Sequence, residues 1–234
     1  MLNHEQIKEN IHVVLENIAQ AERLAGTKEG STTLIAVTKT HSAEALALMH
    51  TLGIKDIGEN YIQEAISKFE ELNWVELSPV RRHFIGHLQS NKAKQAVKYF
   101  DVLQSVDSLK LLETVDKHAE SEGKKIEVML QVNISNESQK SGLSPNEVES
   151  VIKSKNELKN VNLTGIMTIG SIDGQKNDFF LMKELFDRLQ NLENNGIIIK
   201  YISMGMSHDY MEAIKFGATH VRIGTSILGT RNKK

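Results

Sequence analysis

The chain has 234 residues, of which 40% are hydrophobic and 25% charged, with a formal net charge of −2 at pH 7. This composition is typical of a soluble globular protein, and the lack of a basic excess argues against nucleic acid or an anionic membrane as a partner. Cysteine is absent, which excludes disulfides and cysteine-based metal sites and suggests a reducing, cytoplasmic compartment. The N-terminus predicts no secretory signal, and no apolar run approaches the roughly 20 residues of a membrane span.

Helices and strands are predicted to alternate along the chain. An amphipathic helix is expected at 3–25, where apolar residues recur every three or four positions and Asn3 with Gln6 resembles a capping box. Short apolar runs predict strands at 33–39, 56–59, 82–87, 101–106, 126–133, 161–167, 200–204 and 220–224. Further helices are predicted at 42–52, 60–71, 91–98, 108–121, 145–155, 175–194 and 208–216. The tail at 231–234 is expected to be frayed.

Eight strands, each followed by a helix except the last, predict an α/β fold of the (β/α)8 TIM-barrel type with an extra N-terminal helix. A doubly wound open sheet is the alternative. The even strand spacing and the absence of a G-x-G-x-x-G fingerprint after the first strand favour the barrel. Since no linker or compositional break is visible, residues 1–234 are predicted to form a single domain.

The strand at 33–39 ends on a lysine. Alternation places Ile35, Val37 and Lys39 on one face, so the strand carries the amine toward whatever its last residue faces. Desolvation at the end of a core strand lowers the pKa of an ammonium group, and a neutral lysine can form a Schiff base. This signal is weak by itself, because most such lysines simply reach water.

Lys39 is one of many polar residues at the ends of the predicted strands, which is the end of a barrel where active sites lie. These positions are Lys39, Glu59, Asn60, Tyr61, His87, Ser105, Asp107, Asn133, Ser203 to Ser207, Arg222, Gly224 and Thr225. Taken singly, Ser105, Asp107 and Asn133 are better explained as turn or cap residues. The group as a whole indicates a site.

The segment that follows the seventh strand has two interpretations. Gly205 permits a close backbone approach, and Ser207 is expected at a helix start, where backbone amides can bind phosphate. Barrels often bind phosphate in the loops after strands seven and eight. Alternatively, Ser207 is only an N-cap and Asp209 only complements the helix dipole. The segment alone supports both equally.

The eighth strand contains a charged residue between apolar neighbours. Arg222 lies between Val221 and Ile223, so its charge is predicted to be buried and paired. The small and hydroxyl-bearing residues at 224–226 suit an anion cradle. A structural ion pair of Arg222 with a carboxylate, Glu59 or Asp107, is the alternative.

A lysine, an arginine and an anion cradle together suit a ligand that carries both an aldehyde and a phosphate. Pyridoxal 5′-phosphate is the first candidate, and a phosphorylated sugar aldehyde bound as in a Schiff-base aldolase is the second. The histidines show no metal-ligand spacing, and no G-x-S-x-G elbow is present.

Motifs spread over nearly the whole chain match one family. They lie at 35–40, 58–61, 83–92, 105–107, 131–133, 140–142, 165–167, 203–207 with Asp209, and 221–225. The chain resembles the pyridoxal phosphate homeostasis proteins, which are single-domain barrels related to the N-terminal domain of alanine racemase. It departs from the family pattern at His41-Ser42 and at Leu228-Gly229, outside the proposed contacts.

The resemblance implies a set of cofactor-binding residues. They are Lys39, Asn60, Met167, Ser207, Arg222, Gly224 and Thr225. Lys39 would carry pyridoxal 5′-phosphate as a Schiff base. The serine, the glycine and the threonine would hold the phosphate, and the asparagine and the methionine would line the ring pocket. Arg222 would face the pyridine nitrogen and keep it unprotonated, which weakens the ring as an electron sink.

The resemblance also implies a carrier that buffers or delivers the cofactor without established turnover. A racemase needs a second acid/base from an added domain, for which no room is expected after Leu228, although His87 or Tyr61 could serve. A cofactor-dependent enzyme acting on amino acids and a Schiff-base aldolase stay open as alternatives. Apo forms of enzymes that use the cofactor are the expected partners, and a monomer is expected.

Overall fold

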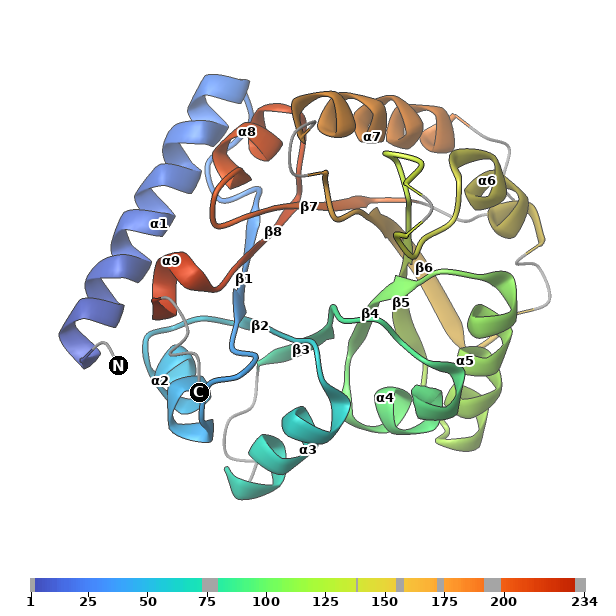
Figure 1. Ribbon diagram of the computed structural model, residues 1–234, viewed down its shortest axis with the longest axis horizontal. Coiled ribbons are helices and arrows are strands. Elements are labelled where there is room, and N and C mark those ends of the chain that lie inside the picture. Colours follow the sequence, from blue (N-terminus) through green and yellow to red (C-terminus); the bar gives the residue numbers. More distant parts are fainter. Residues whose placement is uncertain are drawn as a thin grey trace.

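A closed barrel of eight parallel strands forms the centre of the computed structural model, which describes residues 3–72, 80–137, 139–154, 158–171, 175–191 and 199–229. The strands are β1 (Thr33–Val37), β2 (Asp56–Glu59), β3 (Arg81–Phe84), β4 (Val102–Val106), β5 (Ile126–Gln131), β6 (Val161–Met167), β7 (Tyr201–Met206) and β8 (His220–Ile223). They pair in chain order, and β8 pairs with β1 to close the barrel, seen along its axis in Figure 1. The predicted barrel is confirmed.

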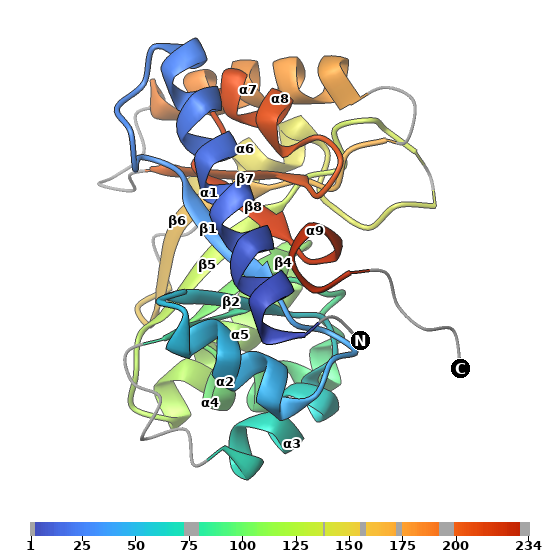
Figure 2. The same ribbon diagram turned by 90° about the vertical axis from the view of Figure 1, so that its left-hand side faces the viewer.

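Helices surround the barrel (Figures 1 and 2). They are α1 (His4–Ala25), α2 (Ala43–Thr51), α3 (Ile62–Glu71), the short 3-10 helix η2 (Ser90–Lys92), α4 (Ala93–Tyr99), α5 (Leu109–Ser121), α6 (Pro145–Ser154), α7 (Gln175–Gln190), α8 (Tyr210–Lys215) and α9 (Thr225–Leu228). No helix within the described ranges is long and apolar enough to cross a membrane.

Several predicted elements end earlier than expected. The predicted strands at 33–39, 82–87 and 126–133 stop at 37, 84 and 131, because their last residues belong to the loops at the barrel mouth. Residue 155, residues 192–194 and the tail at 231–234 lie outside the described residues. The assignment of the chain to a single domain stays a prediction.

The N-terminal helix α1 packs beside α8 and α9, as Figure 2 shows. The predicted capping box is present, with Asn3 and Gln6 exchanging side-chain-to-backbone hydrogen bonds. Buried residues on one face of α1 are Ile7, Ile11, Val14 and Ile18. The Asn10 side chain donates to the Ile227 carbonyl at 2.9 Å. Helix α1 therefore supports the segments that follow β7 and β8 from outside.

Polar side chains are buried among the apolar residues of the barrel. His83, Gln104 and Ser203 are fully buried, and His220 is 3% exposed. Burial, with a smaller effect of the nearby His83, lowers the pKa of His220 to about 3. The folded barrel therefore keeps His220 neutral where an unfolded chain would protonate it, below a pH of about 6.5.

This burial makes the stability of the barrel depend on pH. Between pH 6.5 and 3 the unfolded chain binds a proton at His220 that the folded chain does not bind. The free energy of unfolding therefore decreases by about 1.4 kcal/mol for each unit by which the pH is lowered in this range. His220→Gln should remove this contribution, measured by urea unfolding at pH 7, 6, 5 and 4. His12→Gln, at an exposed position of α1, should leave the parent slope unchanged. Equal slopes in all three chains would contradict the assignment.

Candidate functional site

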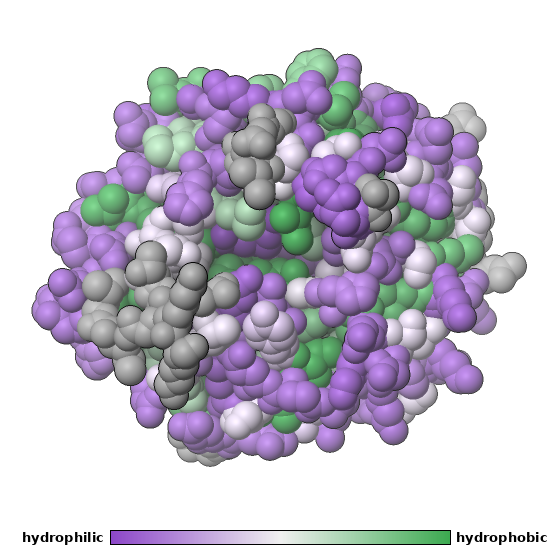
Figure 3. All heavy atoms as spheres, in the orientation of Figure 1, coloured by the Kyte–Doolittle hydropathy of each residue, from purple (hydrophilic) through white to green (hydrophobic). Residues whose placement is uncertain are grey.

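A pocket opens at the end of the barrel where the strands finish. Its cavity of about 250 Å³ lies near the lower limit of small-ligand pockets, roughly 300 Å³. Six of the seven predicted site residues line it: Lys39, Asn60, Ser207, Arg222, Gly224 and Thr225. Figure 3 shows this end of the molecule, with a hollow near its centre bordered by hydrophobic and hydrophilic residues.

Met167 is the predicted site residue that does not line this pocket. It is fully buried and packs with Val102 and Met129 inside the barrel. The pocket is also lined by His41 and Gly229, at the two departures from the family pattern that the sequence placed outside the proposed contacts. Ile85, which lies in the matched motif at 83–92, lines it as well. Ile169 and His208 also reach the pocket, although no matched motif contains them, because they join it only through the closure of the barrel.

A larger hollow of about 560 Å³ lies between α1 and α8. It shares Ser207 with the first pocket, but none of the residues that line it is a lysine or an arginine. Within the parts of the chain that the structure describes, no group of three or more potential ligand side chains is placed to hold a metal ion. The pocket at the strand ends is the candidate site because six of the seven predicted site residues meet there.

Lys39 lies two residues beyond β1 and is half-buried. The backbone amide of Thr38 still donates to the Gly58 carbonyl at 3.1 Å, so the chain follows β2 up to the lysine. Thr40 then adopts a φ of 65°, in the left-handed region. A β-branched residue avoids this region unless neighbouring contacts impose it.

Those contacts come from an ionic network, called the Lys68 network and made of Glu59, Glu64 and Lys68, in which Glu59 and Lys68 are buried and Glu64 is partly exposed. The Lys68 ammonium donates to Glu59 at 2.8 Å, to Glu64 at 2.6 Å and to the Thr38 carbonyl at 2.9 Å. Glu59 also accepts from the Thr38 hydroxyl, and Glu64 accepts from the Thr40 amide. The network therefore fixes the backbone on both sides of Lys39.

Glu59 is fully buried, and desolvation raises the pKa of its carboxyl group against the opposing effects of Lys68 and Thr38. Its Oε2 atom has no hydrogen-bond partner among the described residues. The sequence placed Glu59 among the strand-end polar residues, and the structure assigns it to anchoring the lysine segment. Lys68 carried no signal in the sequence beyond its place in a helix.

Arg222 is 5% exposed and reaches the pocket from β8. Its guanidinium donates to the Ser203 hydroxyl and to the Thr168 carbonyl, each at 2.7 Å. Burial lowers the pKa of Arg222 to about 10, with Asp209 acting in the opposite direction, so the group stays cationic at neutral pH.

The alternative of an ion pair between Arg222 and a carboxylate is wrong for the two residues considered. Glu59 pairs with Lys68, and the Asp107 carboxylate lies 3.6 Å from the His87 ring. Among the ion pairs of the described residues, none includes Arg222. The charge is stabilised by neutral hydrogen-bond acceptors instead.

The loops after β7 and β8 are joined to each other. Ser207 accepts a hydrogen bond from the Ser226 amide at 3.2 Å, and the Ser226 hydroxyl donates to the Ser207 carbonyl at 3.3 Å. Gly205 has a φ of +90°, and a Cβ there would meet Ala213 of α8 at 2.6 Å. The close approach predicted at Gly205 is therefore made to a helix of the protein itself.

The expectation that Ser207 begins a helix is wrong. Helix α8 starts at Tyr210, and Asp209 occupies the N-cap position and accepts from the Met206 amide. Asp209 thus caps the turn, which leaves the Ser207 hydroxyl at the junction of the two loops and at the wall of the pocket.

Asn60 is placed by a glycine. A Cβ on Gly86 would lie 2.1 Å from the Asn60 carbonyl oxygen, so only glycine lets the loops after β2 and β3 pass each other. The Oδ1 atom of Asn60 is buried and lacks a hydrogen-bond partner within the described ranges. A buried polar atom at the wall of a pocket is a contact point for a polar ligand.

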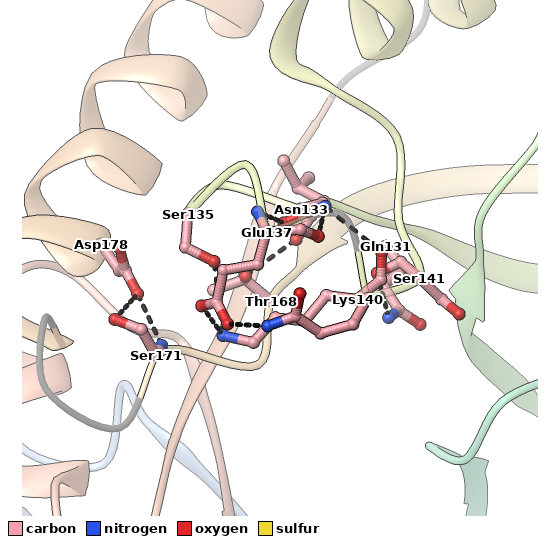
Figure 4. A network of polar contacts seen from close by, with 11 residues as sticks. Gln131, Asn133, Ser135, Glu137, Lys140, Ser141, Thr168, Ser171 and Asp178 are labelled. Atoms are coloured by element: carbon pink, nitrogen blue, oxygen red, sulfur yellow. Dashed lines mark hydrogen bonds and ion pairs between the residues drawn. The ribbon is translucent and has the colours of Figure 1, made fainter.

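Asn133 lies just after β5, beside the barrel mouth. Its interpretation as a turn residue is confirmed. Figure 4 shows its side chain inside the loop, where the amide nitrogen donates to the carbonyls of Glu137 and Lys140 at 2.8 and 3.2 Å. Lys140 pairs with Glu137 across the same loop. The turn interpretation is wrong for Ser105, which lies within β4 with a buried hydroxyl.

Comparison with known proteins agrees with this geometry. Residues 8–232 match the family described as alanine racemase, N-terminal domain. The pyridoxal phosphate homeostasis protein of Pseudomonas aeruginosa is 37% identical over 227 residues, which cover 97% of this chain and 96% of that protein. The chain belongs to the pyridoxal phosphate homeostasis protein family.

Two solved structures resemble this chain to different degrees. PipY of Synechococcus elongatus, solved with pyridoxal phosphate bound, is 33% identical and matches with a TM-score of 0.80, covering 91% of this chain and 100% of PipY. An alanine racemase of Clostridium difficile is 19% identical with a TM-score of 0.69, and the match covers 97% of this chain and 58% of the racemase. This second likeness is one of fold alone.

The Lys68 network predicts a large loss of stability when the Lys68 cation is removed. Lys68→Met should lower the free energy of unfolding by roughly 3–5 kcal/mol, because it leaves buried Glu59 without its cation. Lys183→Met, which breaks an exposed pair with Asp187, should cost less than about 1 kcal/mol. Urea unfolding of both variants measures this, and equal losses would count against the structural role of Lys68.

Proposed function

We propose that this chain binds pyridoxal 5′-phosphate in the barrel pocket through Lys39. The observation that carries the proposal is that a strand-end lysine and a buried arginine, far apart in the sequence, line one small cavity. Membership of the homeostasis family and the cofactor-bound structure of PipY support the same ligand. The unpartnered Asn60 oxygen at the pocket wall fits a polar ring ligand.

Each residue of the pocket has a proposed part in holding the cofactor. Lys39 would hold the cofactor through its amine, since bound pyridoxal phosphate would supply an aldehyde for a reversible covalent attachment with loss of water. Ser207, Gly224 and Thr225 hold the phosphate where the loops after β7 and β8 meet. Arg222 presents a cation to the ring nitrogen. Met167 stays a prediction as a ring contact, since it lies behind the pocket wall.

The chain acts in pyridoxal phosphate homeostasis as a carrier that buffers the cofactor and delivers it to apo enzymes. A racemase-like reaction needs a second acid/base beside the lysine. The sequence offers two candidates for this acid/base. Tyr61 is 53% exposed, and the side chain of His87 is 58% exposed. Neither residue lines the pocket. We propose that the carrier works as a cytoplasmic monomer.

Amino-acid chemistry is the second candidate function. It is favoured by one observation, namely that the imidazoles of His41 and His208 line the pocket and are of the type that transfers protons at neutral pH. A cofactor-free aldolase is the third candidate, since it needs only the lysine and an anion cradle.

Borohydride trapping tests the ligand and its anchor together. Purified protein incubated with pyridoxal phosphate should absorb in the visible range and, after reduction and peptide mapping, carry a single pyridoxyl group on the peptide with Lys39. Lys39→Ala should lose the label, whereas Lys94→Ala, at an exposed position of α4, should keep it. A parent chain that stays colourless and unlabelled would overturn the proposal and leave the aldolase as the better explanation.

Carrier and enzyme are separated with the loaded protein. A carrier should transfer its cofactor to an apo enzyme and leave added L-amino acids unchanged, as followed by activity of the acceptor and by chiral chromatography. Conversion of an amino acid that is lost in His208→Gln, with cofactor still bound, would instead establish the enzyme.

A further inference from the structure

A continuous chain of buried hydrogen bonds leads from the pocket into the barrel. Arg222 Nη1 donates to Ser203 Oγ at 2.7 Å, and Ser203 Oγ donates to Gln104 Oε1 at 2.7 Å. Gln104 Nε2 and His83 Nδ1 are 2.9 Å apart, and His83 Nε2 and Asp56 Oδ1 are 2.8 Å apart. These five side chains, called the relay below, come from β8, β7, β4, β3 and β2.

The charges at its two ends fix the direction of every bond in the relay. A guanidinium can only donate, so the Ser203 oxygen accepts from Arg222. The Gln104 amide presents its carbonyl oxygen to Ser203, so the Ser203 hydroxyl donates to it. The Gln104 amide nitrogen then faces His83 Nδ1, which must accept. The single proton of a neutral His83 therefore lies on Nε2 and points at the Asp56 carboxylate.

The relay leaves little freedom for any member to rearrange. Ser203, Gln104 and His83 are fully buried, so a broken bond would leave a donor or acceptor away from water. His220 lies beside His83, with 6.2 Å between ring centroids, and burial keeps it neutral. Asp56 begins β2, at the end of that strand away from the pocket, with its side chain 14% exposed.

We propose that His83 and Asp56 are positioning residues for Arg222, which hold its guanidinium at the pocket through Ser203 and Gln104. The carboxylate at the start of β2 and the cation in the pocket are joined by neutral groups that all point the same way. The relay thereby fixes where the positive charge meets the ring of the ligand. The effect on bound cofactor rests on the proposed function, whereas the direction of the relay does not.

Two substitutions at one position separate the relay from simple packing. His83→Gln keeps the pattern, because its carbonyl oxygen can accept from Gln104 and its amide nitrogen can donate to Asp56. His83→Leu removes both contacts and leaves Gln104 without an acceptor. Asp56→Asn keeps an acceptor and removes the charge. Glu127→Gln removes a carboxylate from the start of β5 and serves as control, since Glu127 contacts Arg81 and Thr164 outside the relay.

The first measurement needs no ligand. Nitrogen-15 NMR of the histidine side chains in the cofactor-free parent at pH 7 should show His83 neutral with its proton on Nε2, assigned by comparison with His83→Gln. A proton on Nδ1, or a doubly protonated ring, would overturn the proposal whether or not the chain binds pyridoxal phosphate.

The second measurement is binding of pyridoxal phosphate, followed by equilibrium dialysis and by the absorption spectrum. His83→Leu should weaken binding at least about fivefold and shift the absorption maximum, because Arg222 loses its fixed position. His83→Gln should stay within about twofold of the parent, with Asp56→Asn between the two and Glu127→Gln unchanged. Circular dichroism and urea midpoints establish that each variant is folded.

The remaining outcomes also decide the matter. Parent-like affinity and spectrum in a folded His83→Leu would show that Arg222 is positioned without the relay, which overturns the proposal. If His83→Leu fails to fold, Asp56→Asn becomes the deciding variant. Parent-like affinity and spectrum in Asp56→Asn would then overturn the proposal. A parent chain that takes up no pyridoxal phosphate would defeat the proposed function, and the NMR result would still decide the direction of the relay.

Discussion

Burial of positive charge in and beside the barrel is the constraint on which the site depends. Lys68 and Arg222 are both 5% exposed, and an unpaired buried ion costs several kcal/mol. The protein stabilises them in two different ways. Lys68 contacts two carboxylates directly, whereas Arg222 contacts a hydroxyl and a backbone carbonyl. The first arrangement makes a rigid anchor, and the second leaves a cation able to act on a ligand.

These two arrangements serve neighbouring parts of one pocket. The Lys68 network holds the backbone before and after Lys39, including the left-handed turn at Thr40, so the amine leaves a fixed base. Arg222 lies on β8, the strand next to β1 in the barrel, and is held there by the Ser203 hydroxyl and the Thr168 carbonyl. A carboxylate in direct contact with Arg222 would cancel its charge beside the ligand. Neutral acceptors satisfy the guanidinium and keep its field directed into the pocket.

A carrier has different needs from a racemase that shares its fold. In the proposed function the chain holds a reactive aldehyde at Lys39 and releases it, and a half-buried lysine in a small open cavity suits both steps. The chemistry of a racemase needs a further proton donor held in place beside the lysine. Of the side chains that line the pocket, His41 and His208 carry imidazole rings, which can transfer protons. The difference between the two functions therefore lies in the loops, since the barrel is common to both.

Patterns in the amino-acid sequence were enough to predict the barrel and most of the residues that line the pocket. Strand periodicity gave the eight strands, and the polar residues after them identified Lys39, Arg222 and the loop residues near 207 and 224, because side chains that follow parallel strands must gather at one end. The partners of the buried charges became evident only from the folded chain. Lys68 lies in an ordinary helix pattern, and His83, Gln104 and Ser203 lie in ordinary strands. Their bonds join strands that are up to about a hundred residues apart, with Gln104 and Ser203 separated by 99 positions. No local pattern encodes such contacts, since they exist only once the barrel closes.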